Sequence, residues 1–167
     1  MKRAVYLKLF VGLALVLANV SCDQLTKKEV RRSIDSHEYI EVISTNFILT
    51  KVENTGAALS FGQNFAPFVK LIIFQILPIL VLIYMFYYAI HKTDTNLKFI
   101  AITFIVGGGI GNIIDRIRYD SVTDFMYMEL GPLHTGVFNM ADVSVTLGGL
   151  LLLSQWIFRP KHELAQS

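Results

Sequence analysis

Residues 138–158 read FNMADVSVTLGGLLLLSQWIF and contain a single charged side chain, that of Asp142. A run of this length is sufficient to cross a bilayer, for which an α-helix needs about 20 apolar residues. A carboxylate inside such a span is costly unless it faces the protein interior or water. Asp142 is therefore a candidate functional group. The alternative is a structural carboxylate near a helix N-terminus, where the helix dipole favours it.

The composition indicates an integral membrane protein with one small domain, residues 1–167. The chain is 53% hydrophobic and 17% charged, whereas soluble domains carry about 25% charged residues. The net charge of +2 gives no argument for a nucleic-acid partner. The single cysteine, Cys22, excludes an intrachain disulfide and a cysteine-based zinc site. The scattered histidines show no metal-binding spacing, so we expect no metal or cofactor.

Four membrane-spanning helices are predicted, at about residues 4–22, 71–90, 97–114 and 137–158. Arg159 and Pro160 would close the last one, and Pro78 is expected to kink the second, which membrane helices tolerate. The third contains four small residues that favour close helix packing over a phosphate-binding loop: Gly107, Gly108, Gly109 and Gly111.

The long connection 23–70 should be partly folded. Residues 47–53 are rich in strand formers and partly alternate, which predicts a small β element at about 39–62. Residues 23–38 are charged and are expected to be helical at the membrane surface, and residues 115–136 form a shorter loop. The predicted fold class is thus an all-α membrane protein with a small extracytoplasmic sheet and a short surface helix.

Four spans place both termini on one side of the membrane. Lys and Arg number seven on the terminal side and eight on the other, so the raw count does not decide. The basic N-terminus and the short basic connection 91–98 favour cytoplasmic termini. The first 22 residues also resemble a lipoprotein signal ending at Cys22. Asn19 stands where an aliphatic residue is expected, however, and three more spans follow, which favours a retained helix.

Five polar motifs lie at predicted helix ends, and the topology brings all five to the same side. Because they share that side, they indicate a single site. They are Asp23-Gln24-Leu25-Thr26-Lys27, Asn54-Thr55-Gly56-Ala57-Ala58-Leu59-Ser60, Gly111-Asn112-Ile113-Ile114-Asp115-Arg116, Val122-Thr123-Asp124-Phe125 and Phe138-Asn139-Met140-Ala141-Asp142.

Two carboxylates that share a water can hydrolyse an amide without a metal. One is ionised and takes a proton from the water, while the other is protonated and donates to the carbonyl oxygen. Two carboxylates about 3 Å apart cannot both ionise, so the pair holds one proton. Its titration belongs to both residues jointly.

Three aspartates are poorer partners for Asp142. Asp115 is followed by Arg116, which could hold it ionised in a salt bridge. Asp23 precedes Lys27 by four residues, a spacing that forms helical ion pairs. Asp120 lies in a polar run and is expected to be solvated.

Asp124 is the better partner. It lies among Val122, Phe125 and Met126, where desolvation should raise its pKa. We therefore predict a catalytic pair of Asp124 and Asp142, although a loop carboxylate is a plausible alternative for Asp124 alone. Purely structural roles also stay open for other motif residues. Asn112 and Asn139 could cap or cross-link helices, and Asn54-Thr55-Gly56 could form a turn.

The five motifs, in this order, resemble those of lipoprotein signal peptidase, also called signal peptidase II, a bacterial inner-membrane aspartic peptidase. The resemblance covers residues 23–142. The chain departs from the usual pattern at Leu59, Thr123 and Met126, which bears only on fine specificity. The resemblance implies cleavage of diacylglyceryl-modified prolipoproteins just before the lipid-bearing cysteine.

The resemblance also implies site residues. The catalytic aspartates match Asp124 and Asp142. Positions that bind substrate or support the pocket match Asp23, Lys27, Asn54, Gly56, Asn112, Asp115, Arg116, Asn139 and Ala141. The family's periplasmic elements, a small sheet and a helix before the fourth span, match about 39–62 and 126–136. The implied partners are prolipoproteins and membrane lipids, and a monomer is expected.

We expect Asn54, Asn112, Arg116 and Asn139 to hold the substrate backbone or lipid esters and to fix the geometry of the aspartates. Two other classes of protein remain as alternatives. A small transporter would use Asp142 to couple protons or ions. An assembly protein would use the glycine-rich third helix and would tolerate Asn at both aspartates.

Overall fold

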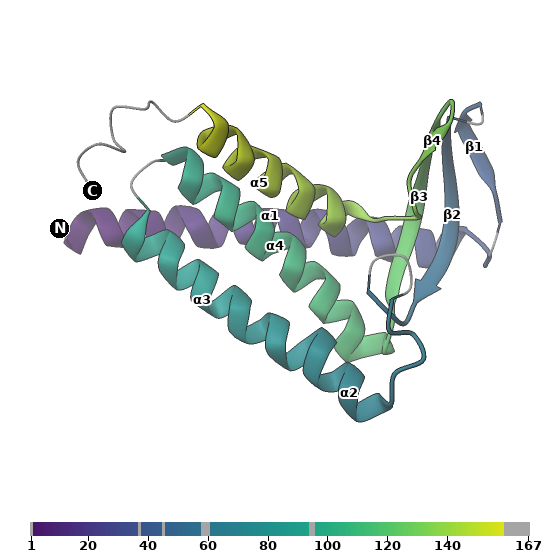
Figure 1. The fold of residues 1–167 in the computed structure, drawn as a ribbon, viewed down its shortest axis with the longest axis horizontal. Helices are drawn as coiled ribbons and strands as arrows, with labels where there is room; N and C mark the ends of the chain where they lie inside the picture. Colours follow the sequence, from purple (N-terminus) through teal and green to yellow (C-terminus); the bar gives the residue numbers. More distant parts are fainter. Residues whose placement is uncertain (1, 37, 45, 58–60, 94–95, 159–167) are drawn as a thin grey trace.

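The computed structural model describes residues 2–36, 38–44, 46–57, 61–93 and 96–158. Leu59, Arg159 and Pro160, named above, lie outside these residues. Long helices run alongside one another, and a small sheet caps one end of the bundle (Figure 1). Four helical segments in the described part are long and apolar enough to span a membrane, as predicted.

The first helix, α1 (Lys2–Ser33), continues well past the predicted end at Cys22 because the charged residues that follow remain helical. The second segment comprises α2 (Pro67–Leu71), a π-helical turn η2 (Ile72–Ile76) and α3 (Leu77–Lys92). The third helix, α4 (Asn96–Tyr119), also extends beyond the end of its apolar run. The fourth, α5 (Met140–Ile157), begins after the cap residue Asn139.

The irregularity in the second segment lies just before Pro78. Proline has no N–H and its ring clashes with the carbonyl four residues earlier, which here belongs to Phe74. The chain forms a π turn there, in which the N–H of Leu77 reaches the carbonyl of Ile72. π turns of this kind absorb local strain within a continuous helix.

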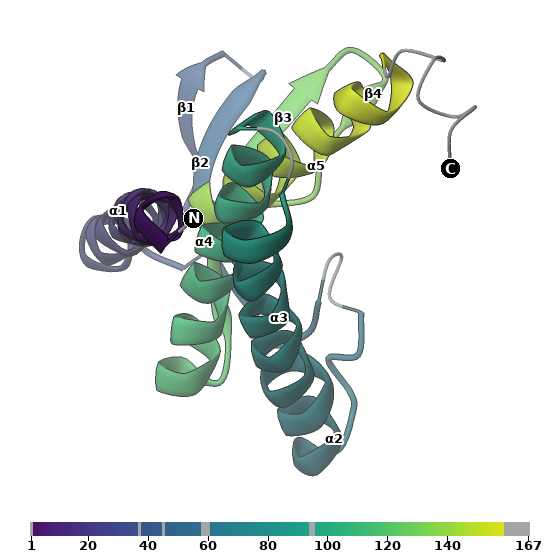
Figure 2. The ribbon, with the colours of Figure 1, turned by 90° about the vertical axis from the view of Figure 1, so that its left-hand side faces the viewer.

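Helix α4 is the centre of the bundle and contacts α1, α3 and α5. It lies between α3 and α5 in Figure 1, and these two helices run in different directions in Figure 2. Its glycines lie at these contacts. A Cβ at Gly107 would lie 2.7 Å from Asn19 of α1, and one at Gly109 would lie 2.8 Å from Leu82 of α3. Gly108 similarly faces the backbone of α5. The glycines therefore permit close packing, as the sequence predicted.

The sheet has four antiparallel strands in the order β1 (Ile40–Ile43), β2 (Phe47–Asn54), β3 (Val122–Leu130) and β4 (Leu133–His134). The β element predicted at 39–62 is confirmed. In the central pair, Val52 of β2 lies opposite Asp124 of β3. The sheet thus joins the two large connections of the chain.

The prediction of a helix at about 126–136 is wrong. This segment contains the end of β3 and the short strand β4. Residues at the start of β3 are mostly β-branched or aromatic, which suits a strand. Strand β2 pairs with them in the sheet. Gly131 has a φ of 61°, a conformation that glycine adopts without a steric penalty, and it reverses the chain between β3 and β4.

Candidate active site

The site forms where β3 meets the N-terminus of α5. Asp124 extends from β3, and Asp142 lies in the first turn of α5. The carbonyl of Phe138 accepts hydrogen bonds from the backbone N–H groups of Phe125 (3.0 Å) and Met126 (2.8 Å). These bonds tie the residues before α5 to the strand, so the two predicted aspartates come together.

The start of α5 is a capping box made by Asn139 and Asp142. The backbone N–H of Asp142 donates to Oδ1 of Asn139 (3.0 Å), and the backbone N–H of Asn139 donates to Oδ2 of Asp142 (3.1 Å). Such a box satisfies two N–H groups that the helix leaves unpaired. Asp142 therefore has the structural role considered above, that of a carboxylate at a helix N-terminus. This role does not exclude a chemical one.

Asn139 also connects the two aspartates. Its Nδ2 donates to Oδ1 of Asp124 at 2.6 Å and to Oδ1 of Asn112 at 3.1 Å. Its side chain is fully buried, so it supports the carboxylates and does not itself reach a substrate. The hydrogen bonds suit the expected role of Asn139 in fixing the aspartate geometry, while its expected contact with substrate stays a prediction.

Two further amides complete the hydrogen bonds of the pair. Nδ2 of Asn54 donates to Oδ2 of Asp124 (3.1 Å), and Nδ2 of Asn112 donates to Oδ1 of Asp142 (2.9 Å). Oδ1 of Asn112 accepts from Nζ of Lys27 (2.9 Å), which fixes the orientation of this amide. Among the described residues, neither aspartate of the pair forms an ion pair with a cation.

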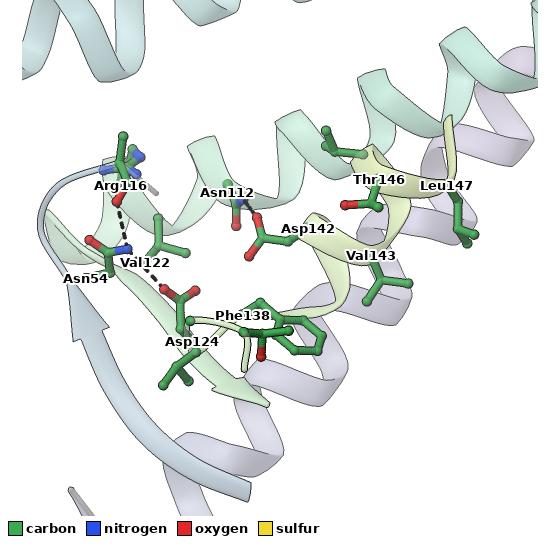
Figure 3. A pocket seen from close by; sticks show the side chains of 15 residues that line it. Asn54, Asn112, Arg116, Val122, Asp124, Phe138, Asp142, Val143, Thr146 and Leu147 are labelled. Carbon is green, nitrogen blue, oxygen red and sulfur yellow. Dashed lines mark hydrogen bonds between the residues drawn. The ribbon is translucent and has the colours of Figure 1, made fainter. Parts of the chain in front are cut away.

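Asp124 and Asp142 both line a cavity of about 660 Å³ (Figure 3). This volume is in the range of small-ligand sites. The cavity walls combine the polar groups Asn54, Asn112 and Arg116 with apolar side chains from the segment before α5 and from α5 itself: Val137, Phe138, Val143, Val145 and Leu147. A substrate with an extended backbone and an apolar side would suit such walls.

The environment of Asp124 favours its protonated form. Its side chain is only 4% exposed. Burial raises its pKa from 3.8 to about 6, and the nearby charge of Asp142 adds to this, while the amide donors Asn54 and Asn139 oppose it. The desolvation predicted from its apolar neighbours is confirmed. A carboxyl group with such a pKa can hold a proton in mildly acidic conditions.

A second group of carboxylates lies beside the cavity and is fully ion-paired. Nζ of Lys27 lies 2.9 Å from Oδ2 of Asp23 and 3.1 Å from Oδ2 of Asp115, and all three side chains are fully buried. Nη2 of Arg31 lies 2.8 Å from Oδ1 of Asp115. The predicted Asp23–Lys27 pair is confirmed. We call these four residues the buried ion network.

The predicted ion pair between Asp115 and Arg116 is wrong. Consecutive residues on a helix point in different directions, so Asp115 faces α1. Arg116 turns towards the cavity, where its Nη2 donates to the carbonyl of Gly56 at 2.6 Å and its guanidinium lies 5.1 Å from the ring of Phe74. The N–H of Gly56 donates in turn to Oδ1 of Asn54, so the turn considered as an alternative for this motif is present.

The buried ion network also fixes α5. The backbone N–H of Ala141 donates to Oδ1 of Asp23 at 2.9 Å. The backbone N–H of Thr123 donates to Oδ2 of Asp115 at 3.2 Å. The network thus holds one residue next to each aspartate of the predicted pair, Asp124 and Asp142. Asp120, by contrast, is exposed as expected.

The predicted site residues all gather at this end of the bundle, but Arg31 was missed. It donates to Oγ1 of Thr123 (2.8 Å) as well as pairing with Asp115. The signal was present: Asp23, Lys27 and Arg31 recur every four residues, which places them on one face of a helix. It was overlooked because the helical segment after Cys22 was expected to lie at the membrane surface, and not to continue the first span alongside Asp115.

The chain shares its sequence and fold with a known group of proteins. The family model described as signal peptidase (SPase) II matches residues 15–158. A lipoprotein signal peptidase of Pelodictyon phaeoclathratiforme is 36% identical over 171 residues, which cover 96% of this chain and 95% of that protein. One from Listeria monocytogenes is 37% identical over 139 residues, covering 83% and 88%.

Solved structures agree. A structure described as a bacterial membrane enzyme, determined by the in meso method at 1.9 Å resolution, matches with a TM-score of 0.79 and 27% identity, over 90% of this chain and 94% of that chain. A second, at 2.3 Å, matches with a TM-score of 0.78. The chain therefore belongs to the signal peptidase II family of bacterial membrane peptidases.

Proposed function

We propose that the protein is an aspartic endopeptidase that removes the signal peptide from diacylglyceryl-modified prolipoproteins, cutting just before the lipid-bearing cysteine. One observation carries the proposal: Asp124 and Asp142 line the same cavity and are joined through buried Asn139, and no cation of the described residues pairs with either. Membership of the signal peptidase II family supports a peptidase that acts on signal peptides.

In this mechanism the pair holds one proton, which resides on Asp124. Its raised pKa, about 6, supports this assignment. Ionised Asp142 takes a proton from a water molecule, and the water oxygen bonds to the carbonyl carbon of the scissile peptide. Asp124 donates its proton to the carbonyl oxygen. When the tetrahedral intermediate collapses, the C–N bond breaks, the proton held by Asp142 passes to the leaving amine, and one hydroxyl of the intermediate returns its proton to Asp124 as the carboxyl product forms.

The amides keep the carboxylates in place for this chemistry. Each aspartate accepts hydrogen bonds on both oxygens, from Asn54 and Asn139 for Asp124 and from Asn112 and the backbone of Asn139 for Asp142. Neutral donors orient a carboxylate without fixing its charge as a paired lysine would. The pair can therefore exchange a proton during the reaction.

The cavity suits a substrate that lies partly in lipid. Phe138, Val143 and Leu147 provide an apolar wall along α5, and Arg116 and Asn54 offer polar groups opposite. A signal-peptide helix could lie against the apolar wall while the scissile bond reaches the aspartates. We place this end of the bundle on the periplasmic face of the inner membrane, with both termini cytoplasmic, on the charge distribution described above.

Purified protein should cleave a diacylglyceryl-modified prolipoprotein in detergent, and cleavage should persist in EDTA. The unlipidated precursor should be a much poorer substrate. Asp124→Asn and Asp142→Asn should abolish cleavage. Loss with Asp115→Asn and Asp142→Asn but not with Asp124→Asn would keep the peptidase and move the partner to Asp115. No cleavage by a folded wild type would refute the proposal and favour a transporter.

A further inference from the structure

A second hollow, of about 440 Å³, lies between the C-terminal parts of α1 and α4. Four of its lining side chains are cationic, and none of the described residues that line it is acidic. We call it the basic pocket, and the residues that matter to the argument are Lys28, Arg31, Arg32, Arg118, Leu25 and Tyr119. It shares no lining residue with the cavity of Asp124 and Asp142.

One of the four cations is held in place by the protein. Arg31 pairs with Asp115 at 2.8 Å, and its guanidinium lies 4.2 Å from the ring centroid of Tyr119. The other three, Lys28, Arg32 and Arg118, have no ion pair or hydrogen bond to any residue that the structure describes. The basic pocket therefore combines one fixed cation with three uncompensated ones.

Helix dipoles do not account for this concentration of charge. Arg31 and Arg32 lie in the last turn of α1, and Arg118 lies in the last turn of α4. Each helix C-terminus carries about half a negative charge, so the two together offset about one cation. Lys28 lies outside the last turn, and its spacing of four residues from Arg32 is repulsive for like charges. An anionic partner would relieve this repulsion.

The depth of the basic pocket points to the lipid headgroups. Its walls begin just beyond the uncharged parts of α1 and α4, residues 9–22 and 99–114. Two of its side chains can contact acyl chains or the interface, since Leu25 is 66% and Tyr119 is 50% exposed. Tyrosine is enriched at the membrane–water interface. An occupant should therefore carry both a negative headgroup and an apolar tail.

We propose that the basic pocket binds the phosphate headgroup of an anionic phospholipid from the surrounding bilayer. Lys28, Arg32 and Arg118 donate to the phosphate oxygens, as basic pockets between membrane helices do elsewhere. Leu25 and Tyr119 contact the upper part of the acyl chains. The inference does not depend on the peptidase chemistry, because the two sites are separate and its test measures binding.

The test is binding of short-chain phosphatidylglycerol to the full-length protein in a neutral detergent, with phosphatidylcholine and inorganic phosphate as comparison ligands. The variant Arg32→Gln/Arg118→Gln removes two cations from the basic pocket. The matched control Lys51→Gln/Lys70→Gln removes two cations outside it. A charge-keeping variant, Arg32→Lys/Arg118→Lys, controls for folding together with the thermal unfolding midpoint.

We expect phosphatidylglycerol to bind in preference to phosphatidylcholine, and Arg32→Gln/Arg118→Gln to weaken it about 25-fold, roughly five-fold for each cation. The lysine variant should retain most of the affinity, and the control should change it less than about two-fold. Equal weakening by the control would mean a diffuse charged surface and would overturn the proposal. Equal binding of phosphatidylcholine would also overturn it, as would equally tight binding of inorganic phosphate.

Discussion

Two groups of buried aspartates lie at the same end of the bundle and differ in their partners. Asp23 and Asp115 are paired with Lys27, and Asp115 also with Arg31. Within the part of the chain that the structure describes, Asp124 and Asp142 are held by amide and backbone N–H groups and not by cations. A nearby cation favours the charged form of a carboxylate, whereas a neutral amide donor orients the carboxylate without adding a countercharge. The first group therefore suits a structural role and the second a chemical one.

The two groups are physically connected. Lys27 of the buried ion network donates to Asn112, which donates to Asp142. Asp23 and Asp115 accept from the backbones of Ala141 and Thr123, each adjacent to one of the amide-held aspartates. The paired group thus orients the unpaired one, and experiments that separate stability from cleavage can test the distinction.

The largest effect is expected at the amide-held aspartates. Asp124→Asn and Asp142→Asn should each lower kcat/KM at least about 10³-fold, because each removes one half of a proton-sharing pair. The double variant should lose little more than either single one, since residues that act as a unit are not additive. Single-turnover cleavage measures this. If the loss in the double variant equalled the product of the two single-variant losses, this result would contradict a shared proton.

In the ion-paired group the main loss should be in stability. Lys27→Met removes the cation between Asp23 and Asp115 and leaves two buried carboxylates, so the free energy of unfolding should fall by about 3–5 kcal/mol. Denaturation followed by circular dichroism measures this. Lys28→Met, at the adjacent exposed position, is the control and should change stability by less than about 0.5 kcal/mol. Equal effects would mean that the network is not structural.

Asn139 both caps α5 and donates to Asp124, and a substitution can separate these two contacts. Asn139→Ser keeps an N-cap oxygen for α5 but cannot reach Asp124, so stability should change by less than about 1 kcal/mol. We expect cleavage to fall about 10- to 100-fold, as for the loss of a positioning contact. Asn139→Ala should show the same loss of cleavage with an additional loss of stability. Wild-type cleavage by the serine variant would show that the bond to Asp124 is dispensable.

The smallest effect is a pH dependence that comes from the proton on Asp124. Well above the pKa, kcat/KM should fall at most about ten-fold for each pH unit. With its pKa raised to about 6, kcat/KM should fall as the pH rises through about 6. Stability follows the same sign: folding favours the protonated form, so this contribution is full below about 3.8 and is lost as pH rises through about 6. A pH profile of kcat/KM checks this, and a rise through pH 6 would mean that Asp124 acts ionised.

The sequence predicted the elements with local signals. The apolar runs revealed four helices, and the strand formers at 47–53 revealed β2. The raised pKa of Asp124 was also predictable, because a carboxyl group within an apolar stretch of sequence is expected to be buried, as this one is. The glycines of the third helix were also interpreted correctly, since small residues in a membrane helix commonly allow close packing against other helices.

Features that depend on tertiary contacts were not predicted. The helical continuation of α1 beyond Cys22 places Lys27 and Arg31 against Asp115, and no hydropathy pattern indicates that face. Residues 126–136 form a hairpin because β2, far away in the sequence, pairs with β3. The bridging role of Asn139 likewise requires β3 and α5 to be adjacent, which only the folded chain provides.

The most direct test of the account compares Asp124→Asn with Asp115→Asn, measuring kcat/KM per folded molecule on a diacylglyceryl-modified prolipoprotein and the unfolding midpoint of each. Asp124→Asn should fold with a midpoint near that of the wild type and show at least about 10³-fold lower cleavage. Asp115→Asn should unfold more easily while its folded fraction cleaves within about ten-fold of wild type. The opposite pattern, with Asp124→Asn active and Asp115→Asn folded but inert, would contradict the assignment of chemistry to the amide-held pair.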